Sequence, residues 1–163
     1  MFIKPLETKE EIRGKAYVNC TAWKEAYVGL VDQAFLDGRT IELVEQRAQR
    51  AFENGVAAFV AKDRDRVIGF VDYGPYRGDD LADTGEIYAI YILKEYYGTG
   101  VGRALMEKSL EALRAYSQVA VWVLAGNERA IRFYKGFGFR FDGQQQILTL
   151  GTPVTNARII LKL

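Results

Sequence analysis

Two spacings of apolar residues alternate along the chain, one typical of helices and one of strands, and together they predict a mixed α/β fold. A short strand is expected over Phe2 to Leu6. Thr8 followed three residues later by Glu11 is typical of a capping box, so a helix is expected from there to about Trp23. A second helix is expected from about Thr40 to Glu53.

The middle of the chain carries strand patterns. Val56 to Ala61 and Val67 to Tyr73 are rich in β-forming residues, and the polar turn from Lys62 to Arg66 between them predicts a hairpin. Gly74 to Asp83 is expected to form an exposed loop. Glu86 to Leu93, "EIYAIYIL", is apolar on both faces except for the glutamate where it begins, which predicts a central, buried strand.

The last part of the chain repeats the alternation. Apolar residues recur at helical spacing from Val101 to Tyr116, and Val119 to Leu124 is a fully apolar strand. A short helix is expected from Asn127 to about Phe137, followed by two β segments, Phe139 to Leu150 and Asn156 to Leu163. The predicted order is β α α β β β α β α β β, with one parallel crossover through the helix that follows the central strand.

Length and composition predict a single domain over residues 1–163, because 49% of the 163 residues are hydrophobic and no repeat or linker divides them. The 22 basic and 21 acidic residues nearly cancel, which argues against a nucleic-acid-binding protein with a broad basic face. No apolar run approaches the roughly 18 residues of a membrane helix, and the first residues lack the pattern of a signal peptide. We therefore expect no membrane partner and a cytoplasmic location.

The cysteine and histidine counts exclude several kinds of chemistry. Cys20 is the only cysteine and the chain has no histidine, so an internal disulfide, a cysteine and histidine zinc site and a nucleophile paired with a histidine base are all excluded. We expect Cys20 to be a small residue of the apolar core, and we expect no metal.

A glycine-rich loop carries the main functional signal. Gly98, Gly100 and Gly102 lie between the central strand and the next helix, where backbone N–H groups and the helix N-terminus can hold a phosphate or pyrophosphate. A Walker A loop is excluded because no Gly-Lys-Ser/Thr sequence occurs. A dinucleotide-binding loop would need a small residue at position 103, where Arg103 stands.

Two motifs together resemble those of the GNAT superfamily of acetyl-CoA-dependent N-acetyltransferases, in its bacterial form. The first is "IYILKEYYGTGVGRALM" and the second is "VLAGNERAIRFYKGFGF", which resembles the family's pattern of Asn, Ala, Phe-Tyr and Gly-Phe. The family's pyrophosphate loop begins with Arg or Gln, and here that position is Tyr97. The resemblance implies the GNAT fold, a central mixed and mostly antiparallel sheet of about seven strands flanked by about four helices, with acetyl-CoA as co-substrate.

The resemblance also implies roles for particular residues. Tyr134 would be the general acid that protonates the leaving thiolate, and Asn127 would contact the cofactor arm. Glu86 is the candidate base, acting directly or through water. Residues expected to bind the cofactor are Ile90, Tyr91, Ile92, Tyr97, Gly98, Thr99, Gly100, Val101, Gly102, Arg103, Asn127 and Lys135.

The sequence says less about the acceptor. Trp23, Tyr27, Tyr73 and Tyr76 come from segments that wall the acceptor side in this family. Three aspartates in the loop between residues 79 and 83 suggest a small cationic amine, such as a polyamine. The expected reaction is therefore acetyl transfer from acetyl-CoA to a primary amine by direct attack.

Other functions remain open at this point. The acceptor can be a protein N-terminus or a lysine, or the domain can be an acyl-CoA sensor without catalysis. A dinucleotide-binding protein requires the helix after Gly102 to pack differently. The resemblance also allows a homodimer, with the apolar tail strands as the candidate interface.

Overall fold

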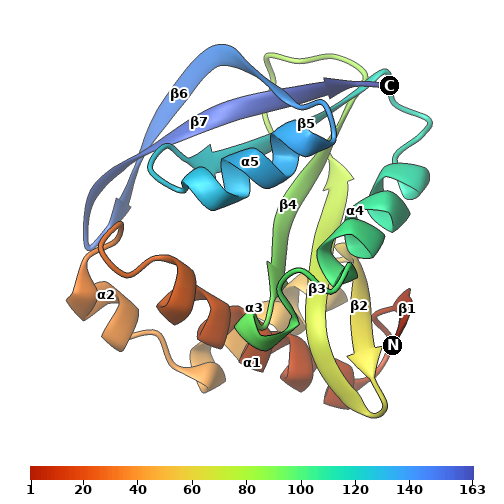
Figure 1. Ribbon diagram of the computed structural model, residues 1–163, viewed down its shortest axis with the longest axis vertical. Coiled ribbons are helices and arrows are strands. Elements are labelled where there is room, and N and C mark those ends of the chain that lie inside the picture. The colour runs from red at the N-terminus through yellow and green to blue at the C-terminus, as the bar shows by residue number, and fades with distance from the viewer.

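The computed structural model describes all residues, 1–163, and shows a seven-stranded sheet with helices on both faces (Figure 1). The elements in chain order are β1 (Phe2–Pro5), α1 (Lys9–Ala26), α2 (Gln33–Asp37), α3 (Ile41–Glu53), β2 (Ala57–Asp63), β3 (Arg66–Pro75), β4 (Thr84–Ile92), the 3-10 turn η1 (Lys94–Tyr96), α4 (Val101–Ala112), β5 (Gln118–Leu124), α5 (Glu128–Gly136), β6 (Arg140–Leu150) and β7 (Thr152–Lys162).

The structure confirms the mixed α/β fold and corrects several boundaries. The chain has five α-helices where about four were expected, because the five-residue α2 was not predicted. The hairpin turn is narrower than predicted, since β2 and β3 continue until only Arg64 and Asp65 remain between them. Gly74 and Pro75 belong to β3 and not to the exposed loop. The tail turn shrinks to Gly151, whose φ of 78° lets β6 and β7 pair closely.

The strand order explains where the sheet opens. The strands lie in the order β1-β2-β3-β4-β5-β7-β6, and every neighbouring pair is antiparallel except β4 and β5. These two form the predicted parallel crossover through α4, but they pair only from Thr84 to Ile87 on β4 and from Gln118 to Val121 on β5. Beyond these residues the two strands diverge (Figure 1).

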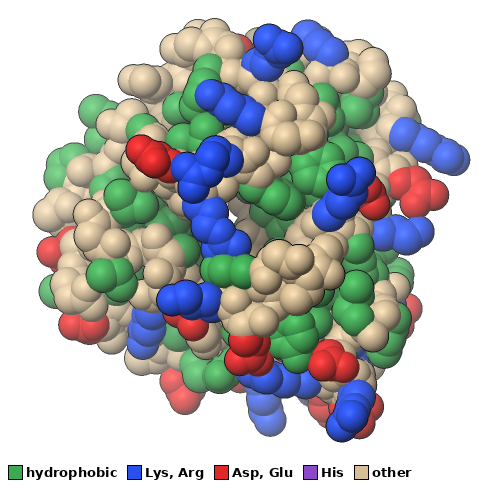
Figure 2. Space-filling model, viewed as in Figure 1, with side chains coloured by type: hydrophobic (Ala, Val, Ile, Leu, Met, Phe, Trp, Pro, Cys, Tyr) green, Lys and Arg blue, Asp and Glu red, His purple; other side chains and the backbone are tan.

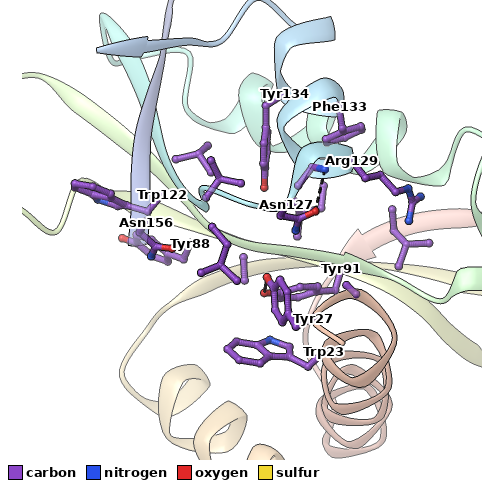
Figure 3. A pocket seen from close by; sticks show the side chains of 18 of the residues that line it. Trp23, Tyr27, Tyr88, Tyr91, Trp122, Asn127, Arg129, Phe133, Tyr134 and Asn156 are labelled. Carbon is purple, nitrogen blue, oxygen red and sulfur yellow. Dashed lines mark hydrogen bonds between the residues drawn. The ribbon is translucent and has the colours of Figure 1, made fainter. Parts of the chain in front are cut away.

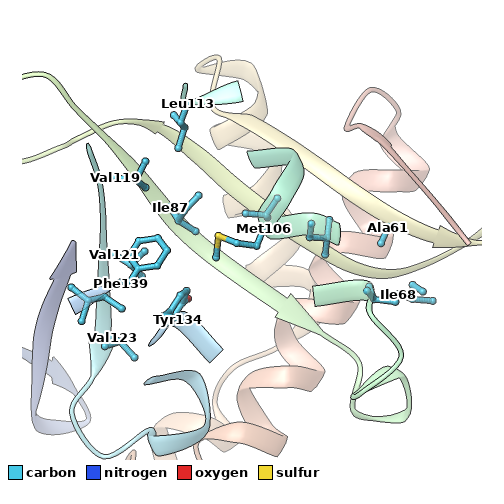
Figure 4. Packing of buried hydrophobic residues seen from close by; sticks show 14 residues of the cluster. Ala61, Ile68, Ile87, Met106, Leu113, Val119, Val121, Val123, Tyr134 and Phe139 are labelled. Carbon is cyan, nitrogen blue, oxygen red and sulfur yellow. The ribbon is translucent and has the colours of Figure 1, made fainter. Parts of the chain in front are cut away.

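Successive side chains of β3 point to opposite faces of the sheet and into separate parts of the core. Phe70 packs in a cluster with Ile12 and Val18 of α1, while Val71 belongs to a larger cluster with α4 and α5. Figure 4 shows this larger cluster, in which Met106 lies close to Ile87 of β4. Ile87 in the paired half of β4 thus belongs to the larger cluster, whereas Ala89 and Tyr91 further along the strand pack against the other cluster.

The first helix begins as the sequence predicts. The Thr8 hydroxyl oxygen accepts a hydrogen bond from the N–H of Glu11, and the Glu11 carboxylate accepts one from the N–H of Thr8, which completes the capping box. Cys20 is buried beside Ala16 and Val44, as expected of a core residue. No helix of the protein is long and apolar enough to cross a membrane.

Candidate active site

A cavity of about 670 Å³ opens where β4 and β5 diverge. Its walls come from the second half of β4, from β5, from α5, from the C-terminal end of α1, and from β6 and β7. Figure 2 shows a narrow hollow in one face of the molecule, bordered by Lys and Arg side chains. The charged residues that line the cavity are Glu25, Arg77, Lys94 and Arg129.

The second half of β4 forms one wall. Ile90, Tyr91 and Ile92, which were expected to lie along the cofactor arm, all line the cavity. Because β4 has lost its partner there, the backbone N–H and C=O groups that point toward β5 have no ladder hydrogen bonds. A ligand inserted between the strands can satisfy these groups as a further strand would.

Tyr134 lies on the opposite wall. Its hydroxyl group points from α5 into the cavity, on the side where Tyr27 and Tyr91 approach (Figure 3). No group of the protein hydrogen-bonds to it, and burial, together with the nearby Tyr27, raises the pKa of Tyr134 well above its usual value. This phenol therefore stays protonated and is free to donate to a ligand.

The side chain of Asn127 can cap a helix and contact a ligand at the same time. Its Oδ1 atom accepts a hydrogen bond from the N–H of Ala130 at 3.2 Å, which makes it the N-cap of α5. Asn127 also lines the cavity, and its NH₂ group remains available to a ligand. The predicted cofactor contact and the ordinary helix cap are therefore compatible.

An aromatic cluster closes the end of the cavity near α1. Trp23 and Tyr27 both line it, and their rings meet edge to face with centroids 4.7 Å apart. The hydroxyl groups of Tyr27 and Tyr91 are hydrogen-bonded at 2.8 Å. The carboxylate of Glu25 belongs to the same end of α1 and is the only carboxylate on the lining.

The glycine loop has the backbone conformation that an anion site needs. Gly98 and Gly100 have φ values of 76° and 92°, and a Cβ added at either would meet no atom within 4 Å. Gly100 is the N-cap of α4 and provides no side-chain hydrogen bond, whereas α1, α2, α3 and α5 all have one. The first N–H groups of α4 thus remain without a capping acceptor.

Other residues of this loop have different surroundings. Tyr97 lines the cavity, Val101 is buried in the core, and the Thr99 hydroxyl donates to the carbonyl oxygen of Tyr96 at 2.6 Å. A Cβ on Gly102 would lie 2.7 Å from the Cδ1 atom of Ile92. The third glycine is therefore required for packing of α4 on β4.

The structure does not bring Glu86 into the cavity. Glu86 is only 1% exposed and is absent from the lining. Its Oε1 atom accepts a hydrogen bond from Nη2 of Arg77 at 2.7 Å, and its Oε2 atom accepts one from the backbone N–H of Arg77 at 2.9 Å. Arg77 and Tyr88, whose ring lies 4.2 Å from the guanidinium carbon of Arg77, are the groups that reach the cavity.

The five loop residues from 98 to 102 are not part of the lining, and four further predicted residues also lie outside it. Tyr73 stacks on Phe59, and the Tyr76 hydroxyl is bound by Arg158 at 2.8 Å. Arg103 and Lys135 make local contacts, with the Glu107 carboxylate and with the Phe141 ring respectively. Of the loop aspartates, Asp80 forms an ion pair with Arg158, and none lines the cavity.

Sequence reasoning missed several lining residues. Arg129, Trp122, Tyr88, Glu25 and Asn156 all line the cavity. Arg129 had a detectable signal, because a cation in the first turn of a helix is unfavourable unless an anion is near. The others had none. Tyr88 and Trp122 face the cavity where β4 and β5 diverge, and Glu25 and Asn156 reach it from α1 and β7.

Comparison with known proteins identifies the family. Residues 22–139 match the model of the acetyltransferase (GNAT) family. The chain is 34% identical over 131 residues to YuaI of Bacillus subtilis, named an N-acetyltransferase, which covers 78% of this chain and 74% of that protein.

Two solved structures share the fold at low sequence identity. The PaiA N-acetyltransferase of Thermoplasma acidophilum, solved with coenzyme A, has a TM-score of 0.74 at 17% identity, with both chains covered fully. A ribosomal-protein-alanine N-acetyltransferase of Brucella melitensis has a TM-score of 0.75 at 20% identity, again over the whole of both chains. These two structures show the fold alone, whereas the family model and the sequence relatives also show the family. The protein belongs to the acetyltransferase (GNAT) family and is an N-acetyltransferase.

Proposed function

We propose that the protein transfers the acetyl group of acetyl-CoA to the primary amine of a small acceptor, by direct attack of the amine on the thioester. The observation that carries this proposal is the unpartnered hydroxyl of Tyr134, which faces the unpaired half of β4 across one cavity. A proton donor and a set of free backbone groups thus converge where a thioester can be held.

The cavity and the glycine loop together fit the parts of acetyl-CoA. The pyrophosphate would bind the N–H groups of residues 98 to 102 at the start of α4, where no side chain caps the helix. The pantetheine arm would lie between β4 and β5 and pair with the backbone of Ile90, Tyr91 and Ile92. The coenzyme A bound in the Thermoplasma neighbour supports this cofactor.

The reaction then needs three events at the thioester. The amine nitrogen attacks the carbonyl carbon, and a backbone N–H of the open half of β4 stabilises the negative charge that develops on the carbonyl oxygen. The carbon–sulfur bond breaks, and Tyr134 donates its proton to the departing thiolate. The products are the acetylated amine and coenzyme A, and solvent takes up the amine's proton and returns one to Tyr134.

The geometry supports a positioning role for Glu86 over direct proton transfer. Both oxygens of its carboxylate are bound by Arg77, and the group is sealed from the cavity. In this proposal Glu86 holds Arg77 against Tyr88, and Arg77 forms the polar part of the cavity wall. The earlier candidate base would need its ion pair broken before it could accept a proton.

The acceptor end of the cavity favours a small cationic amine. Trp23 and Tyr27 offer aromatic surface, which attracts an ammonium group, and Glu25 is the carboxylate beside them. The Trp23 ring already binds one cation, since the guanidinium carbon of Arg39 lies 4.0 Å from its centroid. The loop aspartates no longer contribute to this argument, because none of them lines the cavity. The acceptor class therefore depends on Glu25 and the aromatic cluster.

Thiol release from acetyl-CoA across a panel of polyamines, amino acids, aminoglycosides and short peptides tests the proposal. Wild type would be compared with Tyr134→Phe, and with Tyr116→Phe as a matched control outside the cavity. Release with a small amine that is lost only in Tyr134→Phe supports the proposal. Release with peptides alone would make the protein a peptide or protein acetyltransferase, and tight binding of acetyl-CoA without release would make it a sensor.

A further inference from the structure

Arg129 and Tyr97 form a stacked pair at the edge of the cavity. The guanidinium carbon of Arg129 lies 3.2 Å from the centroid of the Tyr97 ring, and both residues line the cavity. Figure 3 shows Arg129 reaching from α5 along this edge, away from Tyr134. Tyr97 is the first residue of the glycine loop, so the pair joins α5 to the start of that loop.

The cation of Arg129 has no acidic partner in the protein. Arg132 on the same helix pairs with Glu128 at 3.6 Å, but no carboxylate lies within ion-pair distance of Arg129. Arg129 is also in the first turn of α5, where the helix dipole disfavours a positive charge. Both facts make this position unfavourable unless an anion binds there.

The stack on Tyr97 leaves the guanidinium well placed for such an anion. A ring covers one face of the planar group, so its N–H donors remain free around the edge and can bind two oxygens at once. The uncapped N-terminus of α4 follows the same tyrosine along the chain. An anion beside Tyr97 would therefore meet a side-chain cation and backbone donors together.

We propose that Arg129, held in place by Tyr97, binds the pyrophosphate of the coenzyme and supplies from α5 the side-chain charge that the loop itself lacks. This inference rests on the proposed function, because it assumes that acetyl-CoA is the co-substrate. It assigns Tyr97 the role of a platform for the arginine. Tyr97, the unusual first residue of the loop, and the unpaired Arg129 thus act together in binding the pyrophosphate.

Calorimetric titration of coenzyme A into wild type, Arg129→Gln and Arg132→Gln tests the inference without depending on catalysis. Arg129→Gln removes a charge-assisted contact and should weaken binding about tenfold to a hundredfold. Arg132→Gln is the matched control, since it removes an equal charge from the same helix but from an exposed ion pair, and should change affinity less than about threefold. Both variants should melt within a few degrees of wild type, because both side chains are exposed.

Two further arms identify the phosphate and the role of Tyr97. With 3′-dephospho-coenzyme A the loss caused by Arg129→Gln should be as large as with coenzyme A, because the pyrophosphate is present in both. Adding Tyr97→Arg to Arg129→Gln should restore part of the affinity, by returning a cation to the loop. Equal affinity of Arg129→Gln and wild type would overturn the inference, as would a loss that disappears with the dephospho compound. Failure of wild type to bind coenzyme A at all would instead overturn the proposed function on which it rests.

Discussion

The two halves of β4 differ in what they do with polar groups. From Thr84 to Ile87 the strand is paired with β5 and fully buried, and its one carboxylate, Glu86, is bound by Arg77. From Tyr88 to Ile92 the strand has no partner on that side and is half-exposed to the cavity. The first half satisfies its polar groups within the protein, and the second leaves them for a ligand.

The starts of α4 and α5 repeat this contrast. Asn127 caps α5 with its own side chain, while α4 begins at Gly100 with no side-chain acceptor. The start of α5 is therefore capped within the protein, whereas the first N–H groups of α4 have no side-chain acceptor. Backbone polar groups without a partner in the protein therefore occur at two places, the second half of β4 and the start of α4. Substitutions at these places should affect binding and catalysis, and substitutions in the paired half of β4 should affect stability.

Tyr134→Phe should have the largest effect, because it removes the hydroxyl group that faces the unpaired half of β4 and can protonate the thiolate. We expect kcat to fall about a hundredfold or more, with a much smaller change in the KM for acetyl-CoA. Steady-state kinetics with the best acceptor of the panel measures both values. An unaltered kcat would remove Tyr134 from the chemical step, provided that a pre-steady-state burst does not reveal slow product release.

Gly100→Val should come next, through loss of acetyl-CoA binding by about tenfold to a hundredfold. The new side chain has space in the protein itself, so its effects are strain at a φ of 92° and obstruction of a ligand's approach. Gly55→Val is the matched control, because Gly55 has a φ of 80° and equally open surroundings at the end of α3. Comparable stability of the two variants, with affinity lost only in Gly100→Val, separates obstruction from strain. Unchanged affinity in both would contradict the loop assignment.

Local sequence patterns predict the features that depend only on residues close together in the chain. The capping box of Thr8 and Glu11, the glycine loop and the Asn127 cap all appear in the structure as the sequence indicates. The five-residue α2 was missed because so short a segment shows no periodicity, although Asp32 does cap it. Gly102 is predicted to bind the phosphate, and its contact with Ile92 adds a second reason for a glycine at this position, because a Cβ there would clash.

Long-range contacts account for what the sequence did not predict. The divergence of β4 from β5 depends on pairing across the sheet, and it alone decides that Trp122 and Tyr88 face a cavity. The ion pair of Glu86 joins it to a loop arginine nine residues earlier, which no local pattern reveals. The place of Glu86 in the strand makes it a candidate base, and only the fold shows that its side chain is buried.

Glu86→Gln tests the paired half of β4, where we expect the substitution to reduce the stability of the protein. The substitution removes the buried negative charge that pairs with the Arg77 guanidinium. We therefore expect the free energy of unfolding to fall by about 1 to 3 kcal/mol. We expect kcat to fall only a few-fold, because Glu86 acts through Arg77. Urea unfolding and kinetics on the same preparations measure the two effects.

Glu95→Gln is the control for Glu86→Gln, since it breaks an exposed ion pair with Arg66 and should cost less than about 1 kcal/mol. A kcat that falls a hundredfold in Glu86→Gln at unchanged stability would place this carboxylate in the chemistry after all. That result would also erase the contrast between the two halves of β4, because the paired half would then hold a catalytic group.

The smallest expected effect is on the pH dependence of the free energy of unfolding, and it depends on Tyr134. Burial raises the pKa of Tyr134 in the folded protein above the ordinary value near 10, so at higher pH the unfolded chain loses this proton while the folded chain keeps it. Tyr134 therefore contributes stability below about pH 10 that is lost as the pH rises further. The free energy of unfolding should fall by about 1 kcal/mol more in wild type than in Tyr134→Phe between about pH 8 and pH 10.5. Equal slopes would mean that this hydroxyl ionises as freely as one in water, which would contradict its burial in the folded protein.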